Sequence, residues 1–156
     1  MSKIKIIFVC LGNYCRSPMA EAVFKQLARS DGLLDHFDVS SRGTKNWDVG
    51  LRPDPRTIQI LQDNNYPLKS TKRAAQITPI EIQTADYLIA MSQQVAEELN
   101  HPVNTHLLMA FGDNAETLDI PDPYPTDTFP EAFKLIEMGI KDFYTSIKRR
   151  YFQDYA

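Results

Sequence analysis

The chain has 156 residues, of which 24% are charged and 43% are hydrophobic, and its formal net charge at pH 7 is −3. These values are typical of a globular protein, and we expect one domain over residues 1–156. The acidic balance provides no basic field for nucleic acid. No apolar run long enough for a membrane span or a signal peptide is expected either.

The first apolar segment leads into a loop that contains a cysteine. Residues 4–9 are almost all apolar, which predicts a buried strand. Cys10 follows, and an apolar stripe at helical spacing then runs from Ala20 to Ala28. We expect Ser17 to cap this helix and Pro18 to occupy its first position. Cys10 should therefore lie at the carboxyl end of a strand and face a helix N-terminus.

Such a loop suits a tetrahedral oxyanion. Loop and helix-start N–H groups can converge on phosphate oxygens, and the same field stabilises a thiolate at Cys10. Arg16 adds a permanent charge and a planar fork for two oxygens. Asn13 can hold the loop by local hydrogen bonds, and the Ser17 hydroxyl can donate to the sulfur as it leaves. The alternative is a buried cysteine before an ordinary helix, because a bare C-x5-R spacing occurs often by chance.

The remaining segments alternate strands with helices. Strands are expected near residues 37–41, 87–90 and 106–109. Helices should begin at Asp54-Pro55, at the capping boxes Thr78–Glu81 and Thr128–Glu131, and after Ser92. This alternation predicts a parallel α/β sheet that binds its ligand beyond the carboxyl ends of its strands.

A thiolate that attacks phosphorus needs an acid to protonate the leaving oxygen. Asp122 is the best candidate, because two prolines restrict its backbone in the segment Ile120-Pro121-Asp122-Pro123-Tyr124. An aspartate beside proline is also common in ordinary turns, and Asp113, Asp119 and Asp127 are local competitors.

The only two cysteines are Cys10 and Cys15, which suggests reduced thiols in the cytoplasm. A low-pKa thiolate with a second cysteine nearby also fits a reversible Cys10–Cys15 disulfide. The three histidines show no paired spacing, so we expect no metal and no other cofactor.

Three aromatic residues, Tyr14, Trp47 and Tyr124, lie near these motifs. Together they would form a slot for a flat phenyl ring, which suits phosphotyrosine. Trp47 has polar neighbours, which favours an exposed rim over the alternative of a core position. Asp48 would then place a negative charge at this rim.

The segment V-C-L-G-N-x-C-R-S-P-M-A-E over residues 9–21 resembles the signature of the low-molecular-weight protein tyrosine phosphatases. Residues 47–56, 76–78, 86–91 and 122–124 extend the resemblance over nearly the whole chain. It implies a four-stranded, doubly wound parallel sheet with helices on both faces. It also implies hydrolysis of protein phosphotyrosine and small aryl phosphates through a cysteinyl-phosphate intermediate.

The resemblance further implies roles for individual residues. Cys10 would be the nucleophile, Arg16 the phosphate-binding cation and Asp122 the acid. The substrate-binding residues would be Leu11, Gly12, Asn13, Tyr14, Cys15, Ser17, Trp47 and Tyr124.

The sequence departs from the family pattern at several positions. Some members carry an aspartate and an arginine where this chain has Ser40 and Ala75, which suggests that Ser41 and Asn13 support the loop here. Pro125 replaces a second tyrosine, and Tyr14 is bulkier than the usual residue.

Three other functions compete with this interpretation. An arsenate reductase needs further cysteines after Cys15, and the chain has none. A protein-arginine phosphatase carries a small threonine at the position of Tyr14. A non-catalytic phosphate-binding module would usually lack the nucleophile or the acid.

Overall fold

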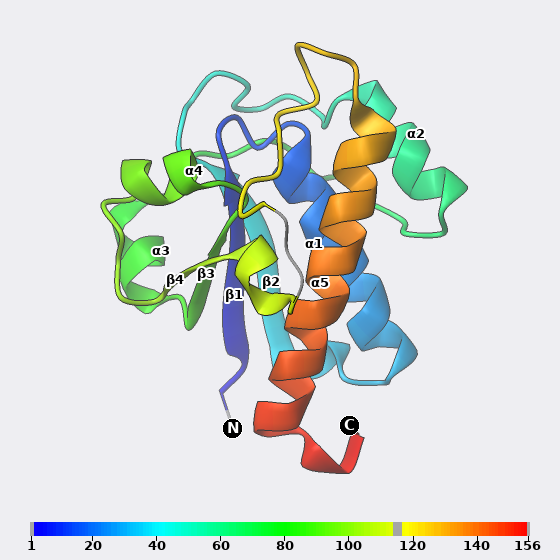
Figure 1. Cartoon of the computed structure of the whole chain (residues 1–156), viewed down its shortest axis with the longest axis vertical. Helices are drawn as coiled ribbons and strands as arrows, with labels where there is room; N and C mark the ends of the chain where they lie inside the picture. Colours follow the sequence, from blue (N-terminus) through cyan, green and yellow to red (C-terminus); the bar gives the residue numbers. More distant parts are fainter. Residues whose placement is uncertain (1, 114–116, 156) are drawn as a thin grey trace.

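The computed structural model of the protein describes residues 2–113 and 117–155, which contain a four-stranded parallel sheet (Figure 1). Its strands are β1 (Ile4–Cys10), β2 (Phe37–Gly43), β3 (Tyr87–Ala90) and β4 (Thr105–Leu107). They lie in the order β2-β1-β3-β4. The chain therefore winds outward from β1 in both directions, which confirms the expected doubly wound α/β class.

The described residues also contain five helices and three short 3-10 segments. The helices are α1 (Arg16–Ser30), α2 (Pro55–Asp63), α3 (Pro79–Thr84), α4 (Gln93–Glu98) and α5 (Phe129–Tyr151). The 3-10 segments are η1 (Leu34–His36), η2 (Leu108–Phe111) and η3 (Gln153–Tyr155). Figure 1 shows α3 and α4 on one face of the sheet and α1, α2 and α5 on the other.

Side chains along β1 alternate between two hydrophobic cores. Ile6 and Phe8 join the larger core, which also contains residues of α1, α2 and α5. Ile7 and Val9 join a smaller core together with Val95 of α4. All four strand residues are fully buried, as expected for a central strand covered on both faces, and this explains the continuous apolar run in the sequence.

Three of the predicted helix caps are confirmed. The Asp54 side chain accepts a hydrogen bond from the backbone of α2, and the Ser92 side chain does the same for α4. Thr78 and Glu81 form the predicted reciprocal capping box at the start of α3. These short polar motifs act locally, so the sequence was sufficient to predict them.

One predicted helix start is wrong. A second is correct, because Thr128 is the N-cap residue of α5, but its predicted capping box does not form. Helix α1 begins earlier than expected, with Cys15 as its N-cap, and Pro18 lies at the third helical position. Thr128 precedes α5, but its hydroxyl lies 2.8 Å from the Thr126 hydroxyl and caps no helix N–H. Its ψ of 47° differs from the extended backbone that a capping side chain normally requires.

Two strand boundaries also differ from prediction. Strand β2 continues to Gly43, two residues beyond the predicted end. Strand β4 covers Thr105–Leu107, and η2 occupies the positions that had been expected to extend it. The three-residue β4 is an edge strand with a single neighbour, so little pairing specifies its length.

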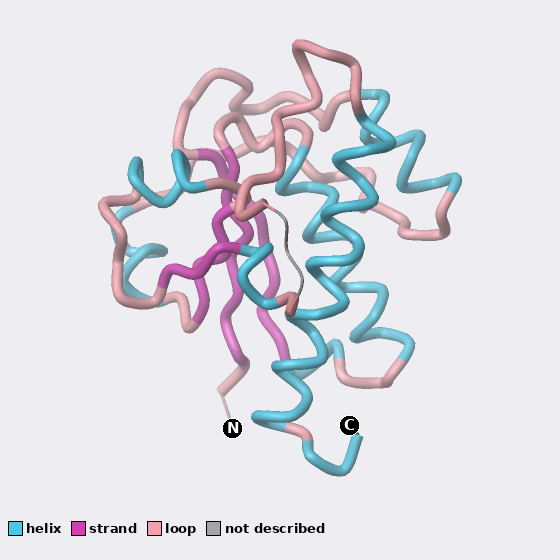
Figure 2. Tube along the Cα trace, viewed as in Figure 1, coloured by secondary structure: helices cyan, strands magenta, loops and turns pink. Residues whose placement is uncertain are grey.

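The carboxyl ends of the central strands meet at one edge of the sheet. Cys10 at the end of β1 is in register with Gly43 of β2, and Val9 is in register with Ala90 of β3. Figure 2 shows long loops gathered at this end of the sheet. This is the edge at which open parallel sheets bind their ligands.

Candidate active site

A tight loop joins β1 to α1 and begins at Cys10. Asn13 has a positive φ of 56°, a left-handed conformation that asparagine tolerates better than most residues. The end of β2 packs directly against this loop. A Cβ at Gly43 would lie only 2.5 Å from the carbonyl oxygen of Leu11, so glycine is required there. Backbone N–H groups of Thr44 and Lys45 then bind the carbonyls of Cys10 and Leu11, which fixes the loop to β2.

A pocket of about 300 Å³ opens above this loop. It brings together most of the residues that the sequence singled out. The lining residues are Cys10, Leu11, Gly12, Tyr14, Cys15, Arg16, Trp47, Asp48, Asp122 and Tyr124. Two predicted substrate-binding residues, Asn13 and Ser17, are fully buried and belong to the support beneath the loop.

Cys10 and Arg16 are held at the floor of this pocket. The Cys10 Sγ lies 3.0 Å from the Ser17 Oγ. The Arg16 Nη1 donates to the carbonyl oxygen of Ile120 at 2.8 Å, which ties the loop to the segment that carries Asp122. Both residues are at least 95% buried, so a thiol and a guanidinium face the pocket from a rigid floor. Such an arrangement suits a tetrahedral anion held against sulfur.

Asn13 organises the support beneath the loop. Its side-chain nitrogen donates to the hydroxyls of Ser17 at 2.8 Å and Ser41 at 3.0 Å. Its side-chain oxygen accepts from the backbone N–H of Ala75 at 3.0 Å. Asn13 and Ser41 were each expected from the sequence to support the loop, and they contact each other. At position 75, the backbone N–H binds the loop.

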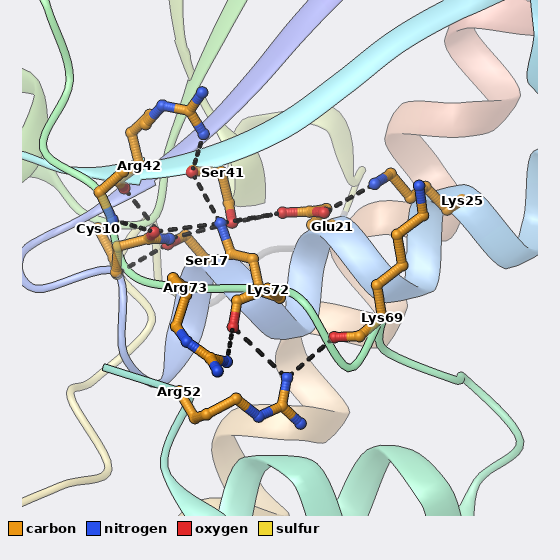
Figure 3. Close-up of polar contacts among 12 residues, drawn as sticks. Cys10, Ser17, Glu21, Lys25, Ser41, Arg42, Arg52, Lys69, Lys72 and Arg73 are labelled. Atoms are coloured by element: carbon orange, nitrogen blue, oxygen red, sulfur yellow. Dashed lines mark hydrogen bonds and ion pairs between the residues drawn. The ribbon is translucent and has the colours of Figure 1, made fainter. Parts of the chain in front are cut away.

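The sequence analysis missed a buried ion pair in this support, formed by Glu21 of α1 and Lys72 (Figure 3). The Lys72 Nζ donates to the Asn13 side-chain oxygen at 3.2 Å and to the Ser41 carbonyl at 3.1 Å. Glu21 accepts from the Ser41 hydroxyl at 2.6 Å. From Asn13 the contacts continue to the Ser17 hydroxyl and from there to the Cys10 sulfur; Figure 3 labels Ser17 and Cys10 beside the ion pair.

Burial and charge oppose each other in this pair. Burial lowers the pKa of Lys72, against the opposing charge of Glu21. Burial alone would raise the pKa of Glu21, but the charges of Lys72 and Lys25 outweigh it, so the pKa lies below its ordinary value. Glu21 is part of the motif over residues 9–21. Its position on a largely buried helix was the one feature of the sequence that could have indicated a buried charge. Lys72 lies in a loop without any pattern.

Two described carboxylates, Asp48 and Asp122, line the pocket. Asp122 accepts from the backbone N–H of Tyr124 at 3.1 Å, which fixes the turn after it. Burial and then the charge of Asp122 raise the pKa of Asp48. The competing residues Asp113, Asp119 and Asp127 are not among the residues that line this pocket.

The aromatic residues form the rim. Trp47 is 64% exposed and Tyr124 is 57% exposed, so Trp47 is not a core residue. The Tyr14 and Tyr124 rings lie 6.2 Å apart in an edge-to-face arrangement. The two rings contact each other, and with Trp47 they form an aromatic side of the pocket that also contains Cys10.

Both cysteines are free, buried thiols. Cys15 is 95% buried. Its burial, followed by the charge of Asp54, raises the pKa of its thiol well above the usual range. Cys15 is therefore a protonated thiol at neutral pH.

The described part of the chain contains five helices. None of its helices is long and apolar enough to cross a membrane. Among residues 2–113 and 117–155, no three His, Cys, Asp or Glu side chains are grouped to hold a metal ion.

Comparison with known proteins identifies close relatives. A family model described as "Low molecular weight phosphotyrosine protein phosphatase" matches residues 5–153. The low molecular weight protein-tyrosine-phosphatase YfkJ of Bacillus subtilis is 34% identical over 152 residues, which are 94% of this chain and 97% of that protein. The crystal structure of YfkJ has a TM-score of 0.91 at 32% identity and covers 97% of this chain and 98% of its own.

Two further relatives differ in the activities for which they are named. Low molecular weight protein-tyrosine phosphatase A of Mycobacterium tuberculosis is 37% identical over 155 residues, with 94% of this chain and 93% of that protein covered. The structure of a drosophila arginine phosphatase has a TM-score of 0.84 at 33% identity and covers 92% of this chain and 98% of its own.

Proposed function

The chain belongs to the low molecular weight phosphotyrosine protein phosphatase family, and from this membership we propose that it hydrolyses phosphotyrosine in proteins through a cysteinyl-phosphate intermediate. One observation carries the proposal. Cys10 and Arg16 of one loop line the same pocket as Asp122, which comes from a segment far away in the sequence. A nucleophile, a cation for the phosphate oxygens and an acid for the leaving group are the three groups that this chemistry requires.

In the first step, the Cys10 thiolate attacks phosphorus in line with the leaving oxygen. Arg16 and the loop N–H groups hold the equatorial oxygens. Asp122 gives its proton to the phenolic oxygen as the P–O bond breaks, and the phosphoryl group is then bound to sulfur. Tyr14, Trp47 and Tyr124 hold the ring of the substrate.

In the second step, ionised Asp122 takes a proton from water. The water oxygen attacks phosphorus, the P–S bond breaks and phosphate leaves. The Ser17 hydroxyl, 3.0 Å from the sulfur, donates to the thiolate as it forms again. No metal or other cofactor takes part in either step.

The simplest test is turnover of p-nitrophenyl phosphate and of a phosphotyrosine peptide. Cys10→Ser should abolish turnover of both, because serine is a far weaker nucleophile here. It should still bind inorganic phosphate in calorimetry, because Arg16 and the loop remain. Wild type that binds phosphate without turning over either substrate would instead be a phosphate-binding module.

Phosphoarginine in proteins is the second candidate substrate. The structural likeness to the drosophila arginine phosphatase and the two pocket carboxylates, Asp48 and Asp122, favour it. The aromatic pair of Tyr14 and Tyr124 favours an aryl phosphate. Matched peptides carrying phosphotyrosine or phosphoarginine decide between the two. Tyr14→Thr should shift the preference toward phosphoarginine.

The remaining properties follow from this assignment. The protein acts as a single domain in the cytoplasm, where its thiols stay reduced, and its partners are phosphotyrosine-containing proteins. Its negative net charge is unsuited to nucleic acid.

A further inference from the structure

Arg56 at the start of α2 holds a position that the proposed chemistry leaves unexplained. Its guanidinium donates two hydrogen bonds to the Asp54 carboxylate, from Nη2 to Oδ2 at 2.9 Å and from Nε to Oδ1 at 3.1 Å. Asp54 is 97% buried, and its backbone N–H donates to the carbonyl of Tyr14 in the nucleophile loop at 3.0 Å. Arg56 is therefore fixed, through Asp54, to the floor of the pocket.

The other side of the same guanidinium contacts the segment that follows Asp122. Its carbon Cζ lies 5.4 Å from the centroid of the Tyr124 ring and 4.2 Å from that of Phe129. Its Nη1 binds the Asp127 carboxylate at 3.1 Å. A flat cation between two aromatic rings and a carboxylate restrains this segment more tightly than a single ion pair would.

The segment that carries Asp122 is thus anchored on both sides. Before Asp122, the Ile120 carbonyl accepts from Arg16 at 2.8 Å. After it, Tyr124 and Asp127 contact Arg56. Arg16, which anchors Ile120, lines the pocket and must also bind phosphate. Arg56 does not line the pocket, so it is available for positioning alone.

We propose that Arg56 is a positioning residue that holds the Asp122 segment against the nucleophile loop, so that the acid reaches the leaving oxygen of the substrate. The inference rests on the proposed function. Arg56 would affect one step of that chemistry, the transfer of a proton to the leaving group. Attack by Cys10 and phosphate binding by Arg16 would remain intact.

The test is the dependence of the first-step rate on the leaving group, measured by single turnover in Arg56→Met. Phosphotyrosine cleavage, which needs the proton, should slow by about 10- to 100-fold, because a small displacement of the acid is sufficient for such a loss. Cleavage of p-nitrophenyl phosphate should change much less, because its leaving group, p-nitrophenolate, is a weak base. Arg56→Lys keeps the charge beside Asp54 and safeguards the fold, and it should give an intermediate loss because it lacks the planar fork.

A double variant separates positioning from a general structural effect. If Arg56 acts through the acid, Arg56→Met should slow phosphotyrosine cleavage no further once Asp122→Ala is present. Lys148→Met is the matched control. Lys148 also pairs with a carboxylate, Asp31 at 3.1 Å, and lies 5.0 Å from a tyrosine ring, but at the far end of α5. It should leave both rates unchanged.

Equal slowing of all leaving groups in Arg56→Met and Arg56→Lys, or losses that multiply in the double variant, would overturn the proposal. Failure of the proposed function has a different signature. In that case wild type would not hydrolyse phosphotyrosine, or Asp122→Ala alone would show no leaving-group dependence.

Discussion

The Lys72 Nζ lies 3.4 Å from a carboxylate oxygen of Glu21, and both side chains are more than 90% buried. Each also contacts a residue that supports the Cys10 loop: Lys72 binds Asn13, and Glu21 binds Ser41. The geometry of the nucleophile loop therefore depends on a pair of charges that never meets the substrate.

Removing the cation from this pair should be costly. We expect Lys72→Met to lower the free energy of unfolding by about 3–5 kcal/mol, because Glu21 would remain as a buried charge with less compensation. Chemical denaturation measures the change. Lys25→Met is the control, since Lys25 also pairs with Glu21 but is more exposed, and it should cost less than about 1 kcal/mol. Equal effects of the two variants would contradict a special role for the buried pair.

Glu21 should make stability depend on pH in the acidic range. Its pKa in the folded state lies below the ordinary carboxyl value of 4.5, so the folded state favours the ionised form. This contribution is fully present above the unfolded pKa and is lost as the pH falls through the folded pKa. The difference in unfolding free energy between wild type and Glu21→Gln should therefore shrink below pH 4.5. A difference that stays constant down to the acid-unfolding limit would contradict this prediction.

Asp122→Ala should damage phosphotyrosine hydrolysis far more than p-nitrophenyl phosphate hydrolysis. Tyrosine leaves with a pKa near 10 and needs a proton, whereas p-nitrophenolate is a much weaker base. Single-turnover rates for a series of aryl phosphates measure the dependence. Asp119→Asn is the control, because Asp119 lies on the same segment but caps α4 through the Gln93 N–H at 2.7 Å. A steep dependence in the Asp119 variant would move the acid role to that residue.

Oxidation of the nucleophile should be reversible through Cys15. Hydrogen peroxide converts the Cys10 thiolate to a sulfenic acid, and the Cys15 thiolate then attacks its sulfur, displacing hydroxide and forming a disulfide. Because the pKa of Cys15 is raised, this second step should become faster as the pH rises. Mass spectrometry and recovery of activity in dithiothreitol follow the reaction. Cys15→Ser should instead lose activity irreversibly, and equal recovery in that variant would exclude Cys15 from the process.

The sequence predicted those parts of the site that are encoded locally. The loop from Cys10 to Arg16 combines a strand end, a glycine and a helix start within a few residues, and the Thr78 capping box is equally compact. The boundary of α1 was misjudged because Ser17, an ordinary capping residue by type, has its hydroxyl engaged by Cys10 and Asn13 instead. Tertiary contacts decided that position.

The support of the site was hidden from the sequence for a different reason. The Lys72–Asn13 bond joins residues 59 positions apart, and the Arg56–Asp127 pair joins residues 71 apart. Neither lysine nor arginine shows any spacing in the sequence that distinguishes a cation with a structural role from a solvated charge. Only the packing of separate segments reveals that Lys72 is buried and that Arg56 contacts the Asp122 segment.

The hydrogen bond between Arg16 and Ile120 joins residues 104 positions apart, so Arg16 is synthesised long before its partner. On a ribosome that adds about 5–20 residues per second, the Cys10 loop and its braces emerge well before the segment that carries Asp122. The nascent chain therefore presents a sulfur nucleophile for several seconds before its acid arrives. During that interval the chain lacks the group that would protonate a leaving phenol.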